Sequence, residues 1–139
     1  MKPVLLDTGV IVALLDSSER LHRACAGAVR VLTSPLITCE AVIAESCYLV
    51  RNLPGAPEAV IDNVTAGIFQ IPVQLSRESA GVKHVLRKYR DRKIDLADAC
   101  LIRLADEFGA ADILTLDRDF LIYRWGKNKP FRMLPNQSL

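Results

Sequence analysis

Residues 4–15 have the sequence VLLDTGVIVALL, in which two apolar runs flank one aspartate, Asp7. The first run, Val4-Leu5-Leu6, is short and aliphatic, which is typical of a strand buried on both faces of a parallel sheet. The second run, from Val10 to Leu15, predicts a short helix. A strand that leads directly into a helix is the unit from which α/β folds are built.

The same alternation continues along the chain. We predict further strands at 36–37, 71–75, 113–115 and 131–134, and helices at 20–32, 39–51, 57–69, from 76 to the basic stretch 87–93, and at 96–108. The expected N-caps are Thr38, Ser76 and Asp95, and Gly109 is expected to end the last helix. Strands separated by helices predict an α/β sandwich, with a parallel sheet covered on both sides. Without repeats or a composition break, the 139 residues are expected to form one domain, 1–139.

Composition indicates a soluble globular protein, with 50% apolar and 24% charged residues. The net charge of +2 does not by itself indicate a nucleic-acid partner, but its distribution is uneven. Residues 1–76 carry 5 basic and 7 acidic side chains, and residues 77–139 carry 13 basic and 9 acidic ones. No apolar run approaches the ~18 residues needed to cross a bilayer. Asp7 also interrupts the only stretch resembling a secretion signal, so we expect a cytoplasmic protein without a membrane span.

The four cysteines do not indicate a metal or disulfide framework. Cys25, Cys39, Cys47 and Cys100 form no C-x-x-C pair and have aliphatic neighbours. With only two histidines in the chain, a zinc site is not expected. We expect buried free thiols in a reducing compartment.

Two acidic residues occupy apolar stretches of the predicted helices. Glu45 has an apolar residue at each of the four positions one helical turn away, so its carboxylate is predicted to project from the face that packs inward. Asp98 has apolar residues at three of the four equivalent positions. Asp62, by contrast, has Glu58 and Thr65 as neighbours and is typical of a solvated acid.

Two further acids follow predicted strands. Asp7 follows Val4–Leu6, and Asp117 follows the aliphatic run that begins at Ile113. Ligands of open parallel sheets bind beyond the carboxyl ends of the strands, where both carboxylates are expected. Several carboxylates in one crevice repel one another unless a cation is present, and an all-oxygen site favours Mg²⁺ or Mn²⁺ over zinc. Such a site is suited to phosphoryl chemistry.

Each acid also has a structural interpretation. Asp7 and Asp117 are suited to cap the helices that follow them. Asp98 lies in a first helical turn, where the helix dipole favours an acid, and Glu45 is able to pair with an arginine. The agreement of four acids on one geometry favours the functional interpretation.

Four segments, in this order and spacing, resemble the PIN-domain ribonucleases. They are LLDTGVIVALLD (5–16), TCEAVIAESCYLV (38–50), DLADACLIRLADEFG (95–109) and ILTLDRDF (113–120). The greatest likeness is to the VapC-like toxins of type II toxin–antitoxin pairs. The resemblance implies a parallel sheet of about five strands flanked by helices, Mg²⁺- or Mn²⁺-dependent endoribonuclease activity, a small antitoxin partner and a homodimer.

The resemblance also assigns roles to individual residues. The acidic positions of the family fall on Asp7, Glu45, Asp98 and Asp117, as catalytic residues and metal ligands. Thr115 stands at a frequent Ser/Thr position, and Thr8 and Asp119 are auxiliary candidates. Gly9 stands where many members have Ser or Asn. The implied reaction is hydrolysis of RNA by in-line attack, leaving 5′-phosphate and 3′-hydroxyl ends.

A basic stretch immediately precedes the predicted helix of Asp98. Residues 77–93 carry seven basic and two acidic side chains, a net charge of +5. We predict that RNA contacts this stretch through Arg87, Lys88, Arg90, Arg92 and Lys93. The alternative is an ordinary solvated helix face. A second candidate patch consists of Arg118, Arg124, Lys127, Lys129 and Arg132.

Other functions compete with the toxin hypothesis. Asp7-Thr8-Gly9 also resembles the signature of retroviral-type aspartic proteases, but those enzymes are nearly all β. A haloacid-dehalogenase-type phosphatase needs a second aspartate where Gly9 stands. Two alternatives within the family stay open, namely a non-toxin RNA-processing nuclease and a nucleic-acid-binding module without catalysis.

Overall fold

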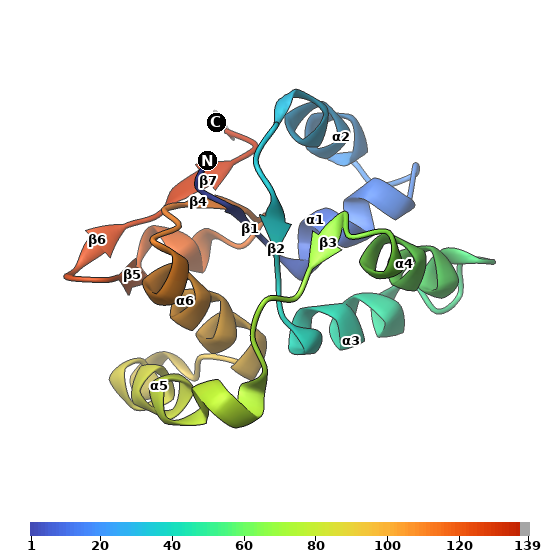
Figure 1. Ribbon diagram of the computed structural model, residues 1–139. Helices are drawn as coiled ribbons and strands as arrows, with labels where there is room; N and C mark the ends of the chain where they lie inside the picture. The colour runs from blue at the N-terminus through green and yellow to red at the C-terminus, as the bar shows by residue number, and fades with distance from the viewer. Residues whose placement is uncertain (137–139) are drawn as a thin grey trace.

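Five short strands form one parallel sheet at the centre of the protein (Figure 1). The computed structural model describes residues 1–136, so the last three residues of the expected 1–139 domain lie outside it. The strands are β1 (Val4–Leu6), β2 (Leu36–Ile37), β3 (Phe69–Gln70), β4 (Asp112–Leu114) and β7 (Arg132–Leu134). Their order across the sheet is β3-β2-β1-β4-β7. The predicted parallel sheet of about five strands is confirmed, and it excludes the nearly all-β protease fold.

Helices cover both sides of this sheet, as the sandwich prediction requires. They are α1 (Thr8–Leu15), α2 (His22–Val31), α3 (Glu40–Leu49), α4 (Ala56–Thr65), α5 (Leu75–Lys88) and α6 (Leu96–Phe108), with short 3-10 turns η1 (Arg90–Arg92) and η2 (Arg118–Leu121). In Figure 1, α5 and α6 lie together on one side of the sheet, α1 and α2 lie on the other, and α3 and α4 gather near β3. Among residues 1–136, no helix combines the length and apolar character needed to cross a bilayer.

The central strands are buried because their side chains pack against helices on both faces. Leu5 and Leu6 of β1 and Ile113 and Leu114 of β4 have no exposed surface. This burial explains why the strand sequences are aliphatic throughout instead of alternating with polar residues.

The register of the sheet brings the ends of β1 and β4 together. Leu6 pairs with Leu114, and the backbone N–H of Asp7 donates to the Leu114 carbonyl at 2.9 Å. The residues that follow the two strands, Asp7 and Thr115, therefore emerge side by side at the carboxyl edge of the sheet.

Thr38 has a different role from the predicted N-cap. Its hydroxyl donates to the Leu6 carbonyl at 2.7 Å, and its backbone N–H donates to Gln70 at 2.8 Å. Cys39 occupies the N-cap position of α3, without a side-chain capping bond. Thr38 has no exposed surface, so its hydroxyl satisfies a strand carbonyl instead of the helix end.

The predicted helix 57–69 and strand 71–75 are displaced in the structure. Helix α4 ends at Thr65, and Gly67 follows with a left-handed φ of 76°. The chain then enters β3 at Phe69, where pairing with β2 recruits residues earlier than the hydropathy indicates. Helix α5 accordingly begins at Leu75, and its N-cap is Gln74 instead of Ser76.

An antiparallel hairpin near the C-terminal end was not predicted from the sequence. Strands β5 (Arg124–Trp125) and β6 (Lys129–Pro130) flank a turn in which Gly126 and Asn128 have left-handed φ angles of 55° and 60°. The Trp125 indole donates to the Pro130 carbonyl at 3.1 Å, and the Lys129 ammonium lies 4.9 Å from the Trp125 ring centroid. Two-residue strands are too short to show an alternating pattern.

A close approach between α5 and α6 depends on Gly81. The Arg103 side chain crosses over this glycine to donate to Glu78 at 2.9 Å, and it also donates to Glu107 at 2.9 Å. A methyl group at Gly81 would come within 2.6 Å of Arg103 Cδ. The absence of a side chain at residue 81 therefore leaves the space in which Arg103 joins the two helices.

Replacing Gly81 with alanine is expected to displace Arg103 and weaken this ion pair. Alanine in a helix gains up to about 1 kcal/mol over glycine, but loss of a half-buried charged hydrogen bond costs about 1.5–3 kcal/mol. We expect Gly81→Ala to lower the free energy of unfolding measured in urea. The control Gly27→Ala in α2, where an added methyl meets nothing within 4 Å, is expected to raise it. In an Arg103→Ala background Gly81→Ala should become stabilising, and an unchanged effect there would contradict the steric explanation.

Candidate metal centre

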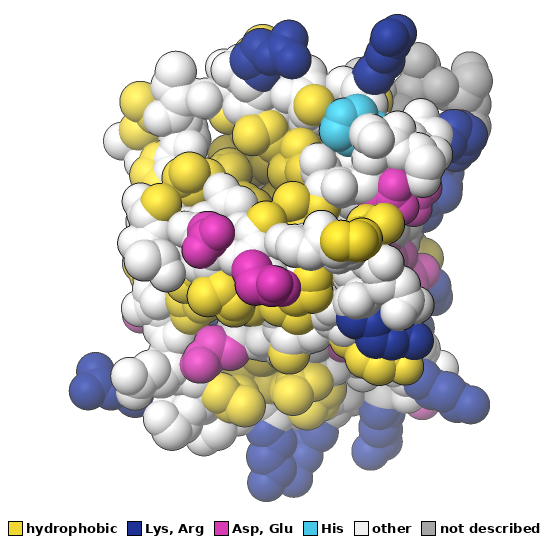
Figure 2. Space-filling model, turned by 90° about the vertical axis from the view of Figure 1, so that its right-hand side faces the viewer, with side chains coloured by type: hydrophobic (Ala, Val, Ile, Leu, Met, Phe, Trp, Pro, Cys, Tyr) yellow, Lys and Arg dark blue, Asp and Glu magenta, His cyan; other side chains and the backbone are white. Residues whose placement is uncertain are grey.

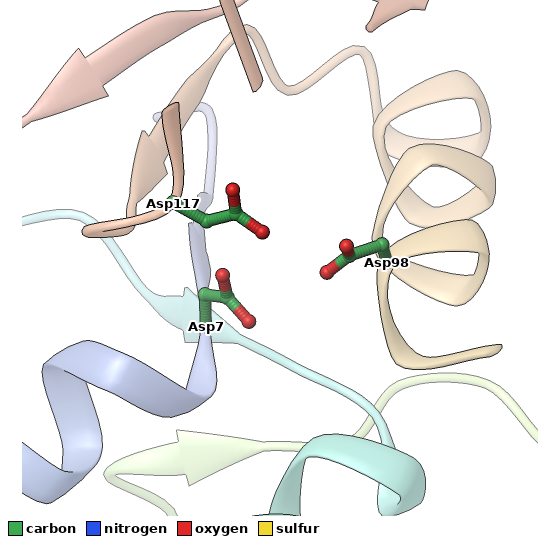
Figure 3. A group of neighbouring side chains, drawn as sticks. All are labelled: Asp7, Asp98 and Asp117. Carbon is green, nitrogen blue, oxygen red and sulfur yellow. The ribbon is translucent and has the colours of Figure 1, made fainter. Parts of the chain in front are cut away.

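Three aspartates from distant parts of the sequence converge at the carboxyl edge of the sheet. Asp7, Asp98 and Asp117 each place one carboxylate oxygen within 4.8 Å of the other two. Asp7 follows β1, Asp117 follows β4 and Asp98 projects from α6, with the three carboxylates directed toward a common point (Figure 3). The predicted convergence is confirmed for these three residues.

The local backbone fixes the orientation of Asp7 and Asp117. Asp7 Oδ1 accepts from the N–H of Thr8 at 2.8 Å and caps α1, while its Oδ2 accepts from the Thr115 hydroxyl at 2.7 Å. The Thr115 hydroxyl also accepts from the Asp117 N–H at 3.0 Å, and Asp117 Oδ1 accepts from the Asp119 N–H at 2.9 Å. The capping interpretation was therefore correct for both acids, and it coexists with their position in the cluster.

Asp98 is held by its helix alone. Asp95 caps α6 by accepting from the Ala97 N–H at 2.6 Å, as predicted, which leaves Asp98 in the first turn facing the sheet edge. Within residues 1–136 the Asp98 carboxylate accepts no hydrogen bond. Its orientation follows from the packing of α6, because Leu101 and Ile102, one turn further along the same face, are buried.

Burial and repulsion between neighbouring carboxylates raise the pKa values of Asp98 and Asp7. Burial, with the charges of Asp7 and Asp117 as the next contributions, raises the pKa of Asp98 to about 8. Burial also raises the pKa of Asp7 to about 6, although the hydrogen bonds from Thr115 and Thr8 partly oppose it. The crevice therefore favours bound protons or another source of positive charge.

The residues present fit a divalent cation. Ion pairs within residues 1–136 involve other acids, so no lysine or arginine neutralises Asp7, Asp98 or Asp117. The buried Thr8 hydroxyl lines the same pocket and lacks a hydrogen-bond partner among the described residues. Carboxylate and hydroxyl oxygens are hard donors of the kind that Mg²⁺ and Mn²⁺ prefer.

Glu45 lies at the rim of the pocket, outside the close cluster. It lines the same cavity, of about 390 Å³, as the three aspartates, and its charge raises the pKa of Asp7 and Asp98. The prediction that Glu45 projects from an inward-packing face was wrong, because its side chain is exposed. Tyr48 and Leu49, one helical turn after Glu45, are likewise 61% and 54% exposed, whereas Val42, one turn before it, is buried, so Glu45 lies at the boundary between core and surface.

The remaining candidates lie around this pocket. Asp119 is not one of the three clustered aspartates, and its carboxylate pairs with Arg92 at 3.5 Å. The predicted RNA-contacting residues, Arg87, Lys88, Arg90, Arg92 and Lys93, are all exposed, at the end of α5 and through η1. Asp95 also lines the acidic pocket, which its role as a helix cap had obscured.

The comparisons with known proteins agree with this architecture. The sequence matches the PIN domain family over residues 4–125, and the chain belongs to that family. Ribonuclease VapC26 of Mycobacterium tuberculosis is 31% identical over 117 residues, which span 83% of this chain and 87% of that protein. The crystal structure of Mycobacterium tuberculosis VapC20, a sarcin–ricin loop cleaving toxin, matches with a TM-score of 0.77 at 18% identity. This structural match covers 91% of this chain and 99% of VapC20. The predicted resemblance to VapC-like PIN domains is therefore confirmed.

Proposed function

We propose that this protein is a divalent-metal-dependent endoribonuclease and the toxin of a type II toxin–antitoxin pair. The observation that carries the proposal is the cluster of Asp7, Asp98 and Asp117, three carboxylates without a basic partner in the described chain. The relative Ribonuclease VapC26 supports RNA as the substrate. We further infer that the protein acts in the cytoplasm, where such a target is found.

Different residues of the pocket would have different roles in hydrolysis. Asp7, Asp98 and Asp117 would hold Mg²⁺ or Mn²⁺, which neutralises charge on the scissile phosphate and lowers the pKa of bound water. Thr115 keeps Asp7 and the backbone of Asp117 in place through its hydroxyl. Glu45, exposed at the rim, is placed to orient water for in-line attack. The products are 5′-phosphate and 3′-hydroxyl ends.

We propose that the RNA backbone binds along the end of the basic stretch, which leads toward the pocket. The turn η1 leads directly into α6, which carries Asp98. The Arg92–Asp119 pair joins η1 to η2, next to Asp117. Phosphate contacts of this kind provide affinity without base specificity.

Reversing three charges of this stretch is expected to weaken RNA binding. We expect Arg87→Glu/Lys88→Glu/Arg90→Glu to reduce affinity about tenfold or more, and to flatten the slope of log affinity against log salt by up to about three. Fluorescence anisotropy with labelled RNA in Ca²⁺ measures both quantities. A control with the same charge change in α2 and the turn before it, Arg20→Glu/Arg23→Glu/Arg30→Glu, should retain most of the affinity. Equal losses in the two variants would remove the basic stretch as the RNA site.

Protein partners are suggested by exposed apolar side chains on α3 and α4. Tyr48, Leu49 and Ile61 are 61%, 54% and 48% exposed. Figure 2, which views the side carrying α2, α3 and α4, shows apolar patches with scattered acidic side chains, and Lys and Arg mostly toward the margins. Exposed apolar patches mark interaction sites, which supports an antitoxin and a homodimer as partners.

The function is tested by inducing the gene and sequencing RNA ends. We expect growth arrest, new 5′-phosphate ends at defined sites, and rescue by a small protein encoded next to the gene. Cleavage without growth arrest or a neighbouring antitoxin gene would favour the RNA-processing nuclease. RNA binding without any cleavage in Mg²⁺ or Mn²⁺ would favour the non-catalytic module.

A further inference from the structure

A second cavity lies behind α6, on the side opposite to Asp98. It has a volume of about 250 Å³ and is formed where the start of α3 meets α5 and α6. Its walls are mostly aliphatic, with Val73 and Val82 among them, and the Glu78–Arg103 ion pair lies at one side. No part of the acidic pocket belongs to it, so the cavity is unused by the proposed hydrolysis.

Two cysteines separated by sixty positions line this cavity together. Cys39 occupies the N-cap position of α3, and Cys100 lies in α6, one turn beyond Ala97. The Cys39 thiol lies 4.0 Å from the Ala97 carbonyl, which places it directly over the first turn of α6. Because Cys100 lies one helical turn beyond Ala97, this contact brings the Cys39 thiol to the part of α6 that carries Cys100, and the neighbouring Cys100 thiol is the largest influence on the pKa of Cys39, which it raises.

The other two cysteines provide a contrast within the same chain. Cys25 is buried in α2, and Cys47 contacts the Pro57 carbonyl at 3.9 Å. Neither of them lines the cavity behind α6. Among the described residues, the paired arrangement of thiols beside an open space is specific to Cys39 and Cys100.

We propose that Cys39 and Cys100 form an oxidisable dithiol, which a small peroxide entering this cavity converts to a disulfide. One sulfur attacks the O–O bond of hydrogen peroxide, giving a sulfenic acid and releasing one water. The second sulfur then attacks the sulfenic sulfur, forming the S–S bond and releasing a second water. Two thiols are oxidised and one peroxide is reduced to two waters, so atoms and electrons balance.

The disulfide would connect α6 to the start of α3, and both helices carry residues that line the acidic pocket. Cys39 precedes α3, which bears Glu45, and Cys100 follows Asp98 by two residues in α6. A cross-link that closes a loop of this length restricts the unfolded chain, so the oxidised protein is expected to melt at a higher temperature. The inference does not depend on the nuclease activity, and its test uses no RNA.

Oxidation of the folded protein tests the proposal directly. After treatment with hydrogen peroxide and blocking of free thiols, we expect loss of two thiols, a peptide pair linked through Cys39 and Cys100, and a Tm higher by about 3 °C or more. A thiol reductant should reverse all three. The matched control Cys25→Ser/Cys47→Ser should behave as the wild type, whereas Cys39→Ala and Cys100→Ala should form no intramolecular link.

Two outcomes would overturn the proposal. One is a linked peptide that joins other cysteines or two chains. The other is a wild-type protein in which Cys39 and Cys100 stay reduced, or become sulfinic acids, without an S–S bond between them. Because the wild-type chain alone decides both, misfolding of a cysteine variant does not affect the conclusion.

Discussion

Asp98→Asn is expected to abolish RNA cleavage and, at the same time, to stabilise the metal-free protein. The asparagine removes one of the three proposed anionic ligands, and losing several kcal/mol of transition-state stabilisation should lower the rate by about a thousandfold or more. The fold should be unaffected, because Asp98 accepts no hydrogen bond from the described residues.

The gain in stability follows from the raised pKa of Asp98. The pKa of Asp98 is about 8 in the folded protein, against an ordinary value of 3.8. The folded protein is therefore most stable with respect to Asp98 below pH ~4, where the carboxyl is protonated in both the folded and the unfolded states. This stability is lost as the pH rises through ~8, because the buried carboxyl must then ionise in the folded protein. Asparagine has no charge to accommodate, so the Tm difference between variant and wild type should grow across this range, with each kcal/mol corresponding to roughly 3–5 °C.

Measuring stability and cleavage together distinguishes the loss of a buried, repelled carboxylate from a loss of activity caused by misfolding. Thermal melts in EDTA at several pH values and cleavage assays in saturating Mg²⁺ are the measurements. Asp62→Asn is the matched control, since Asp62 is exposed on α4 and lies outside the pocket. Wild-type cleavage by a well-folded Asp98→Asn protein would exclude Asp98 from the site. If the Tm of the Asp98→Asn protein and that of the wild type changed equally with pH, the explanation from burial and repulsion would be contradicted.

Chelation is expected to reduce cleavage to the uncatalysed background, and added Mg²⁺ or Mn²⁺ should restore it. Metal binding must compete with protons on Asp98 and Asp7, whose pKa values are about 8 and about 6. At pH 7 roughly one proton should leave the protein for each ion bound, and apparent metal affinity should rise between pH ~6 and ~8.

Calorimetry of Mg²⁺ binding in buffers with different ionisation enthalpies measures this proton release without RNA. The Asp98→Asn protein provides the control, because its main source of protons near pH 7 is gone. Cleavage that persists in excess chelator would contradict the metal-dependent mechanism. Metal binding without proton release would instead show that the carboxylates are already ionised in the empty site.

The sequence was most informative where burial and chemistry conflict. Asp7 and Asp117 stood at the ends of aliphatic runs, and Asp98 stood in an apolar helix, so all three were located correctly. Glu45 was assigned to the pocket, but its surroundings were misjudged. Helical periodicity cannot distinguish a core face from an exposed apolar face, and Tyr48 and Leu49 belong to the latter.

Local boundaries failed where tertiary contacts decided them. Thr38 and Ser76 are good capping residues by type, but the buried hydroxyl of Thr38 was needed by the Leu6 carbonyl. The β3 strand formed at Phe69–Gln70 because β2 lies beside it, which no property of residues 71–75 could reveal. The position of Cys39 and Cys100 in the wall of one cavity likewise arises only from the packing of α3 on α6.

Asp7 performs two tasks at once, since the carboxylate that faces the cluster also begins α1 by accepting the Thr8 N–H. Replacing Asp7 with alanine would therefore remove a carboxylate from the cluster and also destabilise the start of α1. The loss of activity in such a mutant would overstate the catalytic importance of Asp7. Asp98, by contrast, accepts no hydrogen bond from the described residues and caps no helix. An inert but intact protein, for trapping uncut RNA or producing a harmless toxin in quantity, is best made there.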